Sequence, residues 1–150
     1  MYKVLAVDND LLFLDFIRDL LEEAGHRVET AQDGISALHV LETFTPDLMF
    51  LDLIMPNIDG ERLCRIVRKM ERLNNTRIII LSAAAKEESL DASELGVEKI
   101  IAKGPLQNMA DNILAVMATA LEPSSFLPAG QTVSGNFQER GITKELLYTK

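Results

Sequence analysis

The most informative part of the chain is residues 47–60, which read Asp-Leu-Met-Phe-Leu-Asp-Leu-Ile-Met-Pro-Asn-Ile-Asp-Gly. Residues 48–51 are uninterrupted apolar residues of strand length, which predicts a buried strand. Pro56, Asn57, Asp59 and Gly60 favour a turn after it. Asp52 lies between the two. We therefore expect its carboxylate at the carboxyl end of a central strand, where open α/β sheets bind their ligands.

Around this stretch, strand-like and helical patterns alternate five times. Apolar or β-branched runs predict strands at residues 3–7, 26–30, 48–51, 77–81 and 97–102. Helical spacing of apolar residues predicts helices at residues 11–24, from Gly34 to Pro46, at 60–72, at 86–95 and from Pro105 to about residue 120. In the second helix we expect Ile35, Leu38 and Leu41 to face inward. The alternation predicts an α/β, flavodoxin-like, doubly wound five-stranded parallel sheet of order 2-1-3-4-5, with helices on both faces.

Composition limits the class of protein. Of the 150 residues, 47% are hydrophobic and 25% are charged, and no apolar run approaches the roughly 18 residues that span a membrane. The first residues lack the features of a secretory signal, so we expect a cytoplasmic protein that does not insert into membranes. The net charge of −8 argues against direct nucleic acid binding by this segment. Cys64, the single cysteine, lies in an amphipathic pattern and is expected to be a packing residue.

The last thirty residues differ from the rest. Pro, Gly and Ser are frequent in residues 122–141, which predicts a flexible linker after a domain at 1–121. Residues 142–150 contain Thr143 as a possible cap and then Lys-Glu-Leu-Leu-Tyr, which is the start of a helix too short to be stable alone. Two interpretations stay open: a piece leading to a missing output domain, or a natural disordered tail.

Polar residues follow four of the predicted strands. Asp8, Asn9 and Asp10 follow the first, and Asp52, Ser82 and Lys103 end the third, fourth and fifth. Carboxylate and amide oxygens suit a hard cation such as Mg²⁺, while a hydroxyl and an ammonium can bind phosphoryl oxygens. A carboxylate can attack an activated phosphorus directly, so Asp52 is the candidate nucleophile.

Each of these residues also has an ordinary structural explanation. Asp8 and Asp10 could cap the first helix, Ser82 could be a turn hydroxyl, and Lys103 could be a solvated surface charge. Their joint occurrence at four strand ends, which converge on one edge of the sheet, favours a phosphoryl-transfer site.

Residues 1–121 resemble the receiver domain of bacterial two-component response regulators. The resemblance is carried by the strand-end residues, by Leu51-Asp52-Leu53-Ile54-Met55-Pro56 with Asp59-Gly60, and by Leu81-Ser82-Ala83. It implies a signalling switch and not an enzyme, with Asp52 accepting a phosphoryl group from a sensor histidine kinase or a phosphotransfer protein. It further implies that Mg²⁺ is held by Asp8, Asn9, Asp52 and the backbone carbonyl of Ile54, and that Ser82 and Lys103 bind the phosphoryl group.

Three positions depart from the family pattern. Asn9 replaces the second of two adjacent acids, which weakens the expected Mg²⁺ binding. Ile100 stands where an aromatic switch residue is usual, and the usual Lys-Pro pair is here Lys103-Gly104-Pro105. A cis peptide bond, if this loop contains one, is expected before Pro105, since cis bonds are essentially confined to proline.

Three other functions are alternatives to this one. Asp8-Asn9-Asp10 is also the Asp-x-Asp of haloacid dehalogenase-type phosphatases. Those enzymes need acids at the end of a further strand beyond the lysine, whereas here a helix follows Lys103, and Asp111 is its only acid. A nicotinamide- or flavin-binding enzyme lacks its Gly-x-Gly-x-x-Gly. The stronger alternative is a pseudo-receiver, a protein-interaction module that works without phosphorylation. The fourth helix, fifth strand and fifth helix carry mixed charges, which suit a homodimer or an output partner and equally suit a solvated face.

Overall fold

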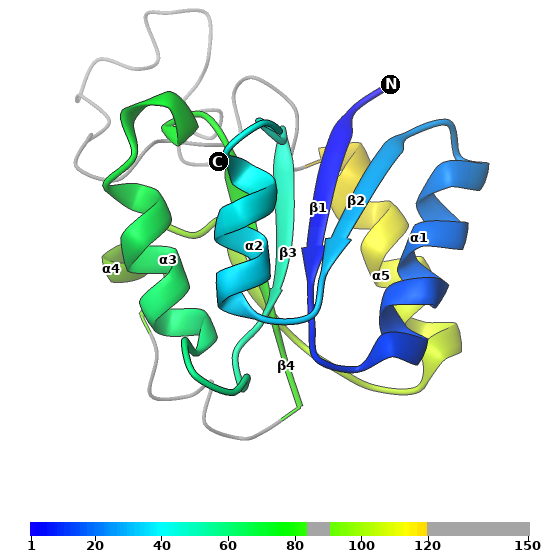
Figure 1. Cartoon of the computed structure of the whole chain (residues 1–150). Coiled ribbons are helices and arrows are strands. Elements are labelled where there is room, and N and C mark those ends of the chain that lie inside the picture. The colour runs from blue at the N-terminus through cyan, green and yellow to red at the C-terminus, as the bar shows by residue number, and fades with distance from the viewer. Residues whose placement is uncertain (84–90, 120–150) are drawn as a thin grey trace, which may run out of the picture.

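The sheet is parallel and five-stranded, in the order β2-β1-β3-β4-β5 (Figure 1). The computed structural model describes residues 1–83 and 91–119. The strands are β1 (Lys3–Val7), β2 (Arg27–Ala31), β3 (Leu48–Asp52), β4 (Arg77–Ser82) and β5 (Lys99–Ala102). The strand order and the direction of every pair confirm the predicted topology.

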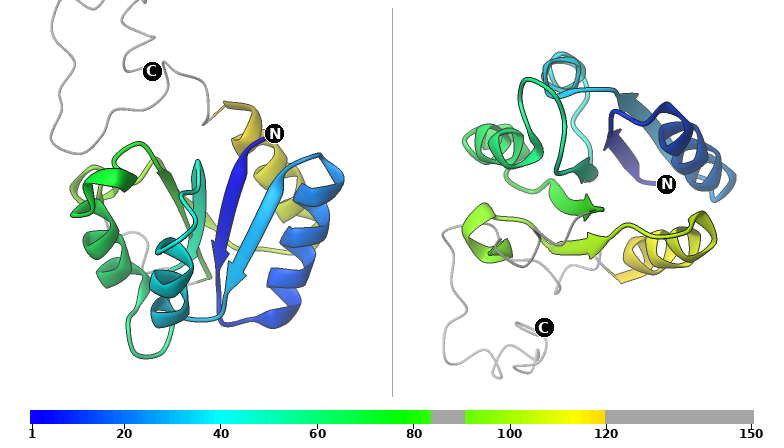
Figure 2. Two further views of the ribbon diagram at one scale, coloured as in Figure 1. Left: turned by 45° about the horizontal axis from the view of Figure 1, so that its top comes forward. Right: turned by 90° about the horizontal axis from the view of Figure 1, so that it is seen from below.

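Helices cover both faces of the sheet, as the two further views show (Figure 2). They are α1 (Leu11–Glu23), α2 (Gly34–Leu41), α3 (Gly60–Arg68), the 3₁₀ turn η1 (Glu71–Leu73), α4 (Ala92–Leu95) and α5 (Leu106–Thr119). Helices α1 and α5 lie together on one face, and α2, α3 and α4 lie on the other. The core is accordingly divided into two apolar clusters, one on each side of the sheet.

Burial decreases from the middle of the sheet to its edge. Every residue of β3 is buried, as are all but the first of β1 and of β4. Strands covered on both faces need apolar residues at successive positions, which explains the continuous apolar run 48–51. Strand β5 is at the edge, and none of its four residues is buried.

Aspartates begin four of the helices. The side chains of Asp10, Asp33, Asp59 and Asp91 each accept a hydrogen bond from a backbone N–H in the first turn that follows. Such caps satisfy donors that the helix itself leaves unpaired. Gly96, at φ 72°, ends α4 in the left-handed conformation that glycine adopts without strain.

Helix α2 differs from its prediction in extent and orientation. It ends at Leu41 instead of continuing to Pro46, and Ile35 is 58% exposed instead of facing inward. The buried face of α2 is formed by Gly34 and Ala37 together with Leu41, and not by Ile35. A Cβ on Gly34 would lie 2.7 Å from the Cβ of Ile58, so small residues form the face that packs closely on the loop after β3.

The segment between α3 and β4 also differs, because α3 ends at Arg68 rather than at Arg72. The guanidinium of Arg68 donates to the carbonyl oxygens of Asn74 and Thr76, at 3.4 and 2.5 Å. Those bonds hold a reversal of the chain in which η1 buries Leu73 completely. A continuous helix would have pointed Leu73 elsewhere.

Some predictions fall outside the described residues. Residues 84–90 include the first half of the fourth helix predicted at 86–95, whose described part begins at Ala92 after the Asp91 cap. Residues 120–150 contain the linker predicted at 122–141 and the tail at 142–150. Within the described ranges, no helix is long and apolar enough to cross a membrane.

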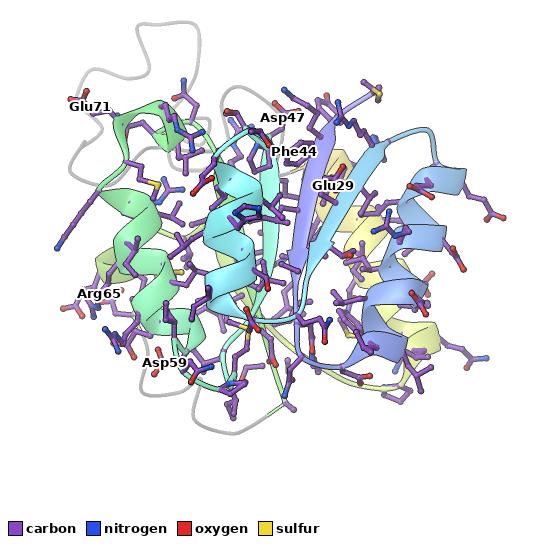
Figure 3. The ribbon with its side chains drawn as sticks, in the orientation of Figure 1. Glu29, Phe44, Asp47, Asp59, Arg65 and Glu71 are labelled. Atoms are coloured by element: carbon purple, nitrogen blue, oxygen red, sulfur yellow. The ribbon has the colours of Figure 1, made fainter. Side chains whose placement is uncertain are left out.

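The amino end of the sheet is held by Asp47, which Figure 3 places near Phe44 and far from Asp59. Its carboxylate accepts from the backbone N–H of Lys3 at 2.8 Å, and its carbonyl accepts from that of Arg77 at 3.0 Å. Asp47 thereby joins the starts of three strands. The polar strand-end residues lie at the opposite, carboxyl edge of the sheet.

Cys64 is fully buried in the core, as the sequence predicted, and burial raises the pKa of its thiol to about 12. We expect the native protein to react with a thiol reagent at pH 8 at least about a thousandfold more slowly than an exposed cysteine, because the thiolate is the reactive form. Reaction followed by mass spectrometry, before and after unfolding in urea, measures this. Arg62→Cys on the exposed side of the same helix is the reactive control, and rapid labelling of native Cys64 would contradict the prediction.

Candidate functional site

The carboxyl ends of β1, β3, β4 and β5 meet at one edge of the sheet, the lower edge in Figure 1. Asp8 follows β1 directly, Asp52 and Ser82 are the last residues of β3 and β4, and Lys103 follows β5. Asp52 is level with Leu81, and Ser82 with Ala102, in the strand register. Parallel pairing therefore gathers residues that are up to 95 positions apart in the chain.

Asp8 is 1% exposed and forms an ion pair with Lys103. Lys103 Nζ lies 2.5 Å from Asp8 Oδ2, while Asp8 Oδ1 accepts a hydrogen bond from the backbone N–H of Asp10 at 2.9 Å. Both carboxylate oxygens thus have a donor, which is the condition for keeping a charge buried. Asp8 is therefore a site residue and does not cap α1.

Asp52 is 7% exposed and lies beside the same ammonium, with 3.7 Å between Lys103 Nζ and Asp52 Oδ1. Burial raises the pKa of the Asp52 carboxyl, and the negative charge of Asp8 raises it further. Lys103 and a hydrogen bond from the backbone of Ile54 act in the opposite direction. The site consequently holds two like charges that one lysine compensates only in part.

Lys103 is positioned by contacts from two sides. Its backbone N–H donates to the carbonyl of Ser82 at 2.7 Å, which fixes the start of the loop after β5. Its ammonium lies 4.8 Å from the ring centroid of Phe13 in α1, a cation–π distance. Ser82 is buried beside it. Lys103 is thus directed into the site and not into solvent.

The other predicted site residues are placed differently. Asp10 caps α1, because its Oδ1 accepts from the N–H groups of Leu12 and Phe13 at 3.0 and 3.3 Å. Asn9, between the two acids, is exposed. The side chain of Ile54 is 54% exposed, two residues beyond Asp52. The Gly104–Pro105 bond is trans, as is every peptide bond among residues 1–83 and 91–119.

The loop after Asp52 is closely packed against the start of α3. The N–H of Gly60 donates to the carbonyl of Leu53 at 2.9 Å. A Cβ at position 60 would lie 2.3 Å from the carbonyl oxygen of Asp52 and 2.8 Å from Cα of Leu53. Asn57 turns the loop with φ 66°, a conformation that asparagine tolerates better than most residues. The backbone of Asp52 is therefore held by the first residue of a helix.

A divalent cation fits the chemistry of this site. Asp8 and Asp52 place two buried carboxylates next to each other, and an added cation would reduce their repulsion. In the described part of the chain no group of three or more His, Cys, Asp or Glu residues could hold a metal ion. A cation here would be held by two carboxylates and by neutral oxygens. Mg²⁺ usually binds proteins through one or two carboxylates and keeps several waters.

Two contributors to the site escaped sequence analysis. The helical pattern of residues 11–24 accounts for Phe13 as an apolar residue of α1, but it does not reveal the contact with Lys103. Gly60 was assigned to a turn, whereas the close approach of its Cα to the Asp52 carbonyl is what excludes a side chain. In both cases the missing information is the distance between elements.

Comparisons with known proteins agree with this geometry. The strand order and the alternating helices are those of the CheY-like α/β fold. More particularly, the chain belongs to the response regulator receiver domain family, whose model matches residues 4–114. It is thus a two-component signalling domain.

Individual relatives support the same assignment. The chain is 35% identical over 104 residues to the alkaline phosphatase synthesis transcriptional regulatory protein PhoP of Bacillus subtilis, covering 67% of this chain and 42% of PhoP. The chain therefore spans less than half of that relative. Response regulator TrrA of Thermotoga maritima, solved with Mg(2+)-BeF, has a TM-score of 0.65 at 25% identity, covering 77% of this chain and 99% of TrrA. Chemotaxis response regulator CheY4 of Vibrio cholerae has a TM-score of 0.69 at 27% identity, covering 77% and 98%.

Gly60→Ala should disturb the backbone of Asp52, since the new methyl group would overlap backbone atoms that cannot rotate away. We expect a loss of about 1–3 kcal/mol in the free energy of unfolding, measured by urea denaturation. Gly104→Ala is the matched control, because a Cβ there would have no atom within 4 Å. Equal stabilities of the two variants would contradict the packing described.

Asp52→Asn should make the protein more stable at neutral pH. The pKa of Asp52 is raised in the folded state, so the native protein retains this proton to higher pH than the unfolded chain does. The contribution of the Asp52 carboxyl to the free energy of unfolding is therefore greatest below its pKa in the unfolded chain. That contribution is lost as the pH rises through its pKa in the folded protein. We expect a higher Tm than wild type at pH 7 and a vanishing difference near about pH 3, where the carboxyl is protonated in both states.

Thermal melts followed by circular dichroism between these pH values test this. Asp15→Asn on the exposed side of α1 is the control, and it should leave the pH dependence unchanged. A lower Tm for Asp52→Asn throughout the range would contradict the electrostatic argument.

Proposed function

We propose that this domain is a phosphorylation-dependent switch that accepts a phosphoryl group on Asp52. The observation that carries the proposal is the buried pair of carboxylates, Asp8 and Asp52, with the Lys103 ammonium between them. A receiver domain implies a cognate kinase partner. The donor we propose is the phosphohistidine of a sensor histidine kinase or of a phosphotransfer protein, and the compartment is the cytoplasm.

The transfer breaks one bond and forms another. An oxygen of the Asp52 carboxylate attacks the phosphorus, a P–O bond forms, and the P–N bond to the donor imidazole breaks. The electron pair of that bond stays on the imidazole nitrogen, which takes up a proton. No general base is needed, because the ionised form of a carboxylate attacks directly. Lys103 neutralises charge on the phosphoryl oxygens, and Ser82 donates to one of them.

We propose that Mg²⁺ is held by Asp8, Asn9, Asp52 and the backbone carbonyl of Ile54. When bound, the ion would neutralise charge on the incoming phosphoryl group. Response regulator TrrA was solved in complex with Mg(2+)-BeF, which supports Mg²⁺ as the metal by family resemblance. Asn9 supplies a neutral oxygen in place of an acid. We therefore expect weaker Mg²⁺ binding than two adjacent acids would give.

Phosphorylation would be transmitted through β5. When Lys103 and Ser82 move onto the phosphoryl group, the strand between them in the sequence, β5, would move as well. The equilibrium between two conformations of the surface formed by α4, β5 and α5 would then shift. Ile100 has no ring to rotate, and it packs against the core on the α2–α3 side. We propose that it transmits the change by packing, and that the α4–β5–α5 surface serves a homodimer or an output partner.

Asp52→Asn should abolish acid-labile phosphorylation. Wild type incubated with acetyl phosphate and Mg²⁺ should acquire one phosphoryl group by intact-mass analysis, and the variant none, because an amide oxygen cannot form the acyl phosphate. Asp59→Asn is the matched control: it keeps a capping side chain at the start of α3 and should be phosphorylated normally.

A second measurement, binding of a phosphoryl mimic, separates the phosphorylation switch from the pseudo-receiver alternative. A true phosphoacceptor should also bind beryllofluoride in the presence of Mg²⁺, detected by ¹⁹F NMR, and should lose this binding in Asp52→Asn. A wild-type protein that neither binds beryllofluoride nor becomes phosphorylated would refute the proposal and favour an interaction module.

A further inference from the structure

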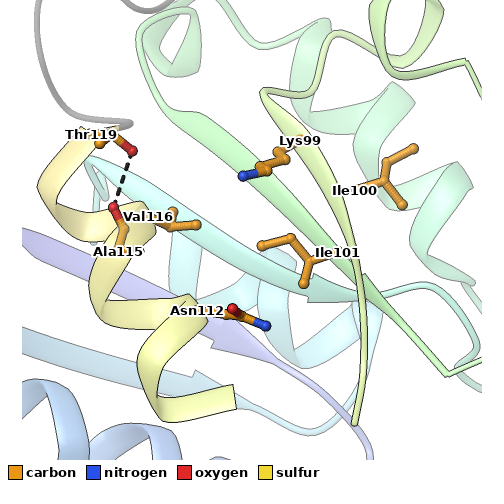
Figure 4. Close-up of a pocket in the computed structure, with 7 residues that line it drawn as sticks. All are labelled: Lys99, Ile100, Ile101, Asn112, Ala115, Val116 and Thr119. Carbon is orange, nitrogen blue, oxygen red and sulfur yellow. Dashed lines mark hydrogen bonds between the residues drawn. The ribbon is translucent and has the colours of Figure 1, made fainter. Parts of the chain in front are cut away.

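A groove runs between the edge strand β5 and helix α5, with a volume of about 490 Å³ (Figure 4). Ile101 and Lys99 extend from the strand toward the helix, whereas Ile100 points the other way. The helix contributes Asn112, Val116 and Thr119. The groove is thus apolar along its floor and polar at its ends.

The strand side of the groove offers backbone groups as well. Strand β5 pairs only with β4 among the residues the structure describes, so its other edge is not paired with a strand there, and three of its residues line the groove. An open strand edge with adjacent apolar positions is the surface that an extended peptide recognises. The groove therefore suits a short extended segment that carries apolar side chains.

The chain itself supplies such a segment. Thr119, the last residue of α5, lines the groove, and 31 residues follow it. Phe126 and Leu127 are seven and eight residues further on, which gives a reach of up to about 23 Å. The groove follows α5 back to Asn112, over about 10 Å. Residues that return from Thr119 can therefore extend along the whole groove.

Charge complements the apolar match. Lys99 is the only charged residue among those that line the groove, and it is exposed. Glu122 is the only charged residue between Thr119 and Phe137, and it lies three positions beyond the end of α5. A segment that turns back from Thr119 can thus bring Glu122 to Lys99 and then Phe126 and Leu127 to the apolar floor.

We propose that residues 121–128 of this chain bind in cis to the β5–α5 groove. Phe126 and Leu127 are the anchors. The segment then covers part of the surface that a second copy or an output partner would use, so the two compete for one site. The inference does not depend on phosphorylation of Asp52, and its test uses unphosphorylated protein.

Hydrogen exchange of the β5 amides in the full chain, followed by mass spectrometry, tests the proposal. Phe126→Ser/Leu127→Ser should raise the exchange rate at residues 99–102 about tenfold, because docking covers the open edge of β5. Phe137→Ser is the matched control, an equal change at a tail position outside the segment, and it should leave the rate unchanged. Ala115→Arg, which places a long side chain in the groove from an exposed position, should reproduce the double variant.

The exchange rates distinguish docking in cis from the alternatives. Faster exchange in the double variant and in Ala115→Arg, at a rate independent of protein concentration, supports docking in cis. Equal exchange in wild type and the double variant overturns it. Protection that increases over about a hundredfold rise in protein concentration also overturns it and assigns the groove to a second copy. Unchanged far-ultraviolet circular dichroism checks that the variants remain folded.

Discussion

The structure depends on one electrostatic constraint, the placing of two carboxylates against one ammonium at the end of a buried sheet. Asp8 and Asp52 are almost entirely removed from water, and Lys103 is within 2.5 Å of the first and 3.7 Å of the second. Burying charge is costly unless it is compensated, and a single lysine leaves the pKa of Asp52 raised. The site is consequently short of positive charge, which makes its chemistry suited to an added cation.

The surroundings of the site keep these groups in place. Gly60 brings the start of α3 onto the carbonyl of Asp52, and Phe13 lies beneath the ammonium of Lys103. Strand β5 is central to the connection outward, because Lys103 follows its last residue, Ile100 packs into one core cluster, and Ile101 packs against the other. A movement of Lys103 therefore acts on the strand that also forms one wall of the β5–α5 groove. The strand-end site and the groove therefore lie at the two ends of β5.

Much of the fold could be predicted because its signals are local. The continuous apolar run at 48–51 and the β-branched run at 77–81 predict the central strands, and Asp10 is a predicted cap of the first helix. Errors arose where a partner distant in sequence decides. Ile35 fits an inward helical position, but the close approach of Ile58 demands small residues at that interface instead. The helix predicted to reach Arg72 ends at Arg68, because hydrogen bonds to Asn74 and Thr76 reverse the chain.

The sequence by itself determined the order of elements, the topology of the sheet and the four strand ends at which polar residues collect, since alternation and parallel pairing follow from hydrophobic periodicity. Only the tertiary structure decided which residues meet. It separated Asp8, which pairs with Lys103, from Asp10, which caps α1, although the two acids are only two positions apart. It also raised the pKa of Asp52, because desolvation and the field of Asp8 exist only once the strands are side by side.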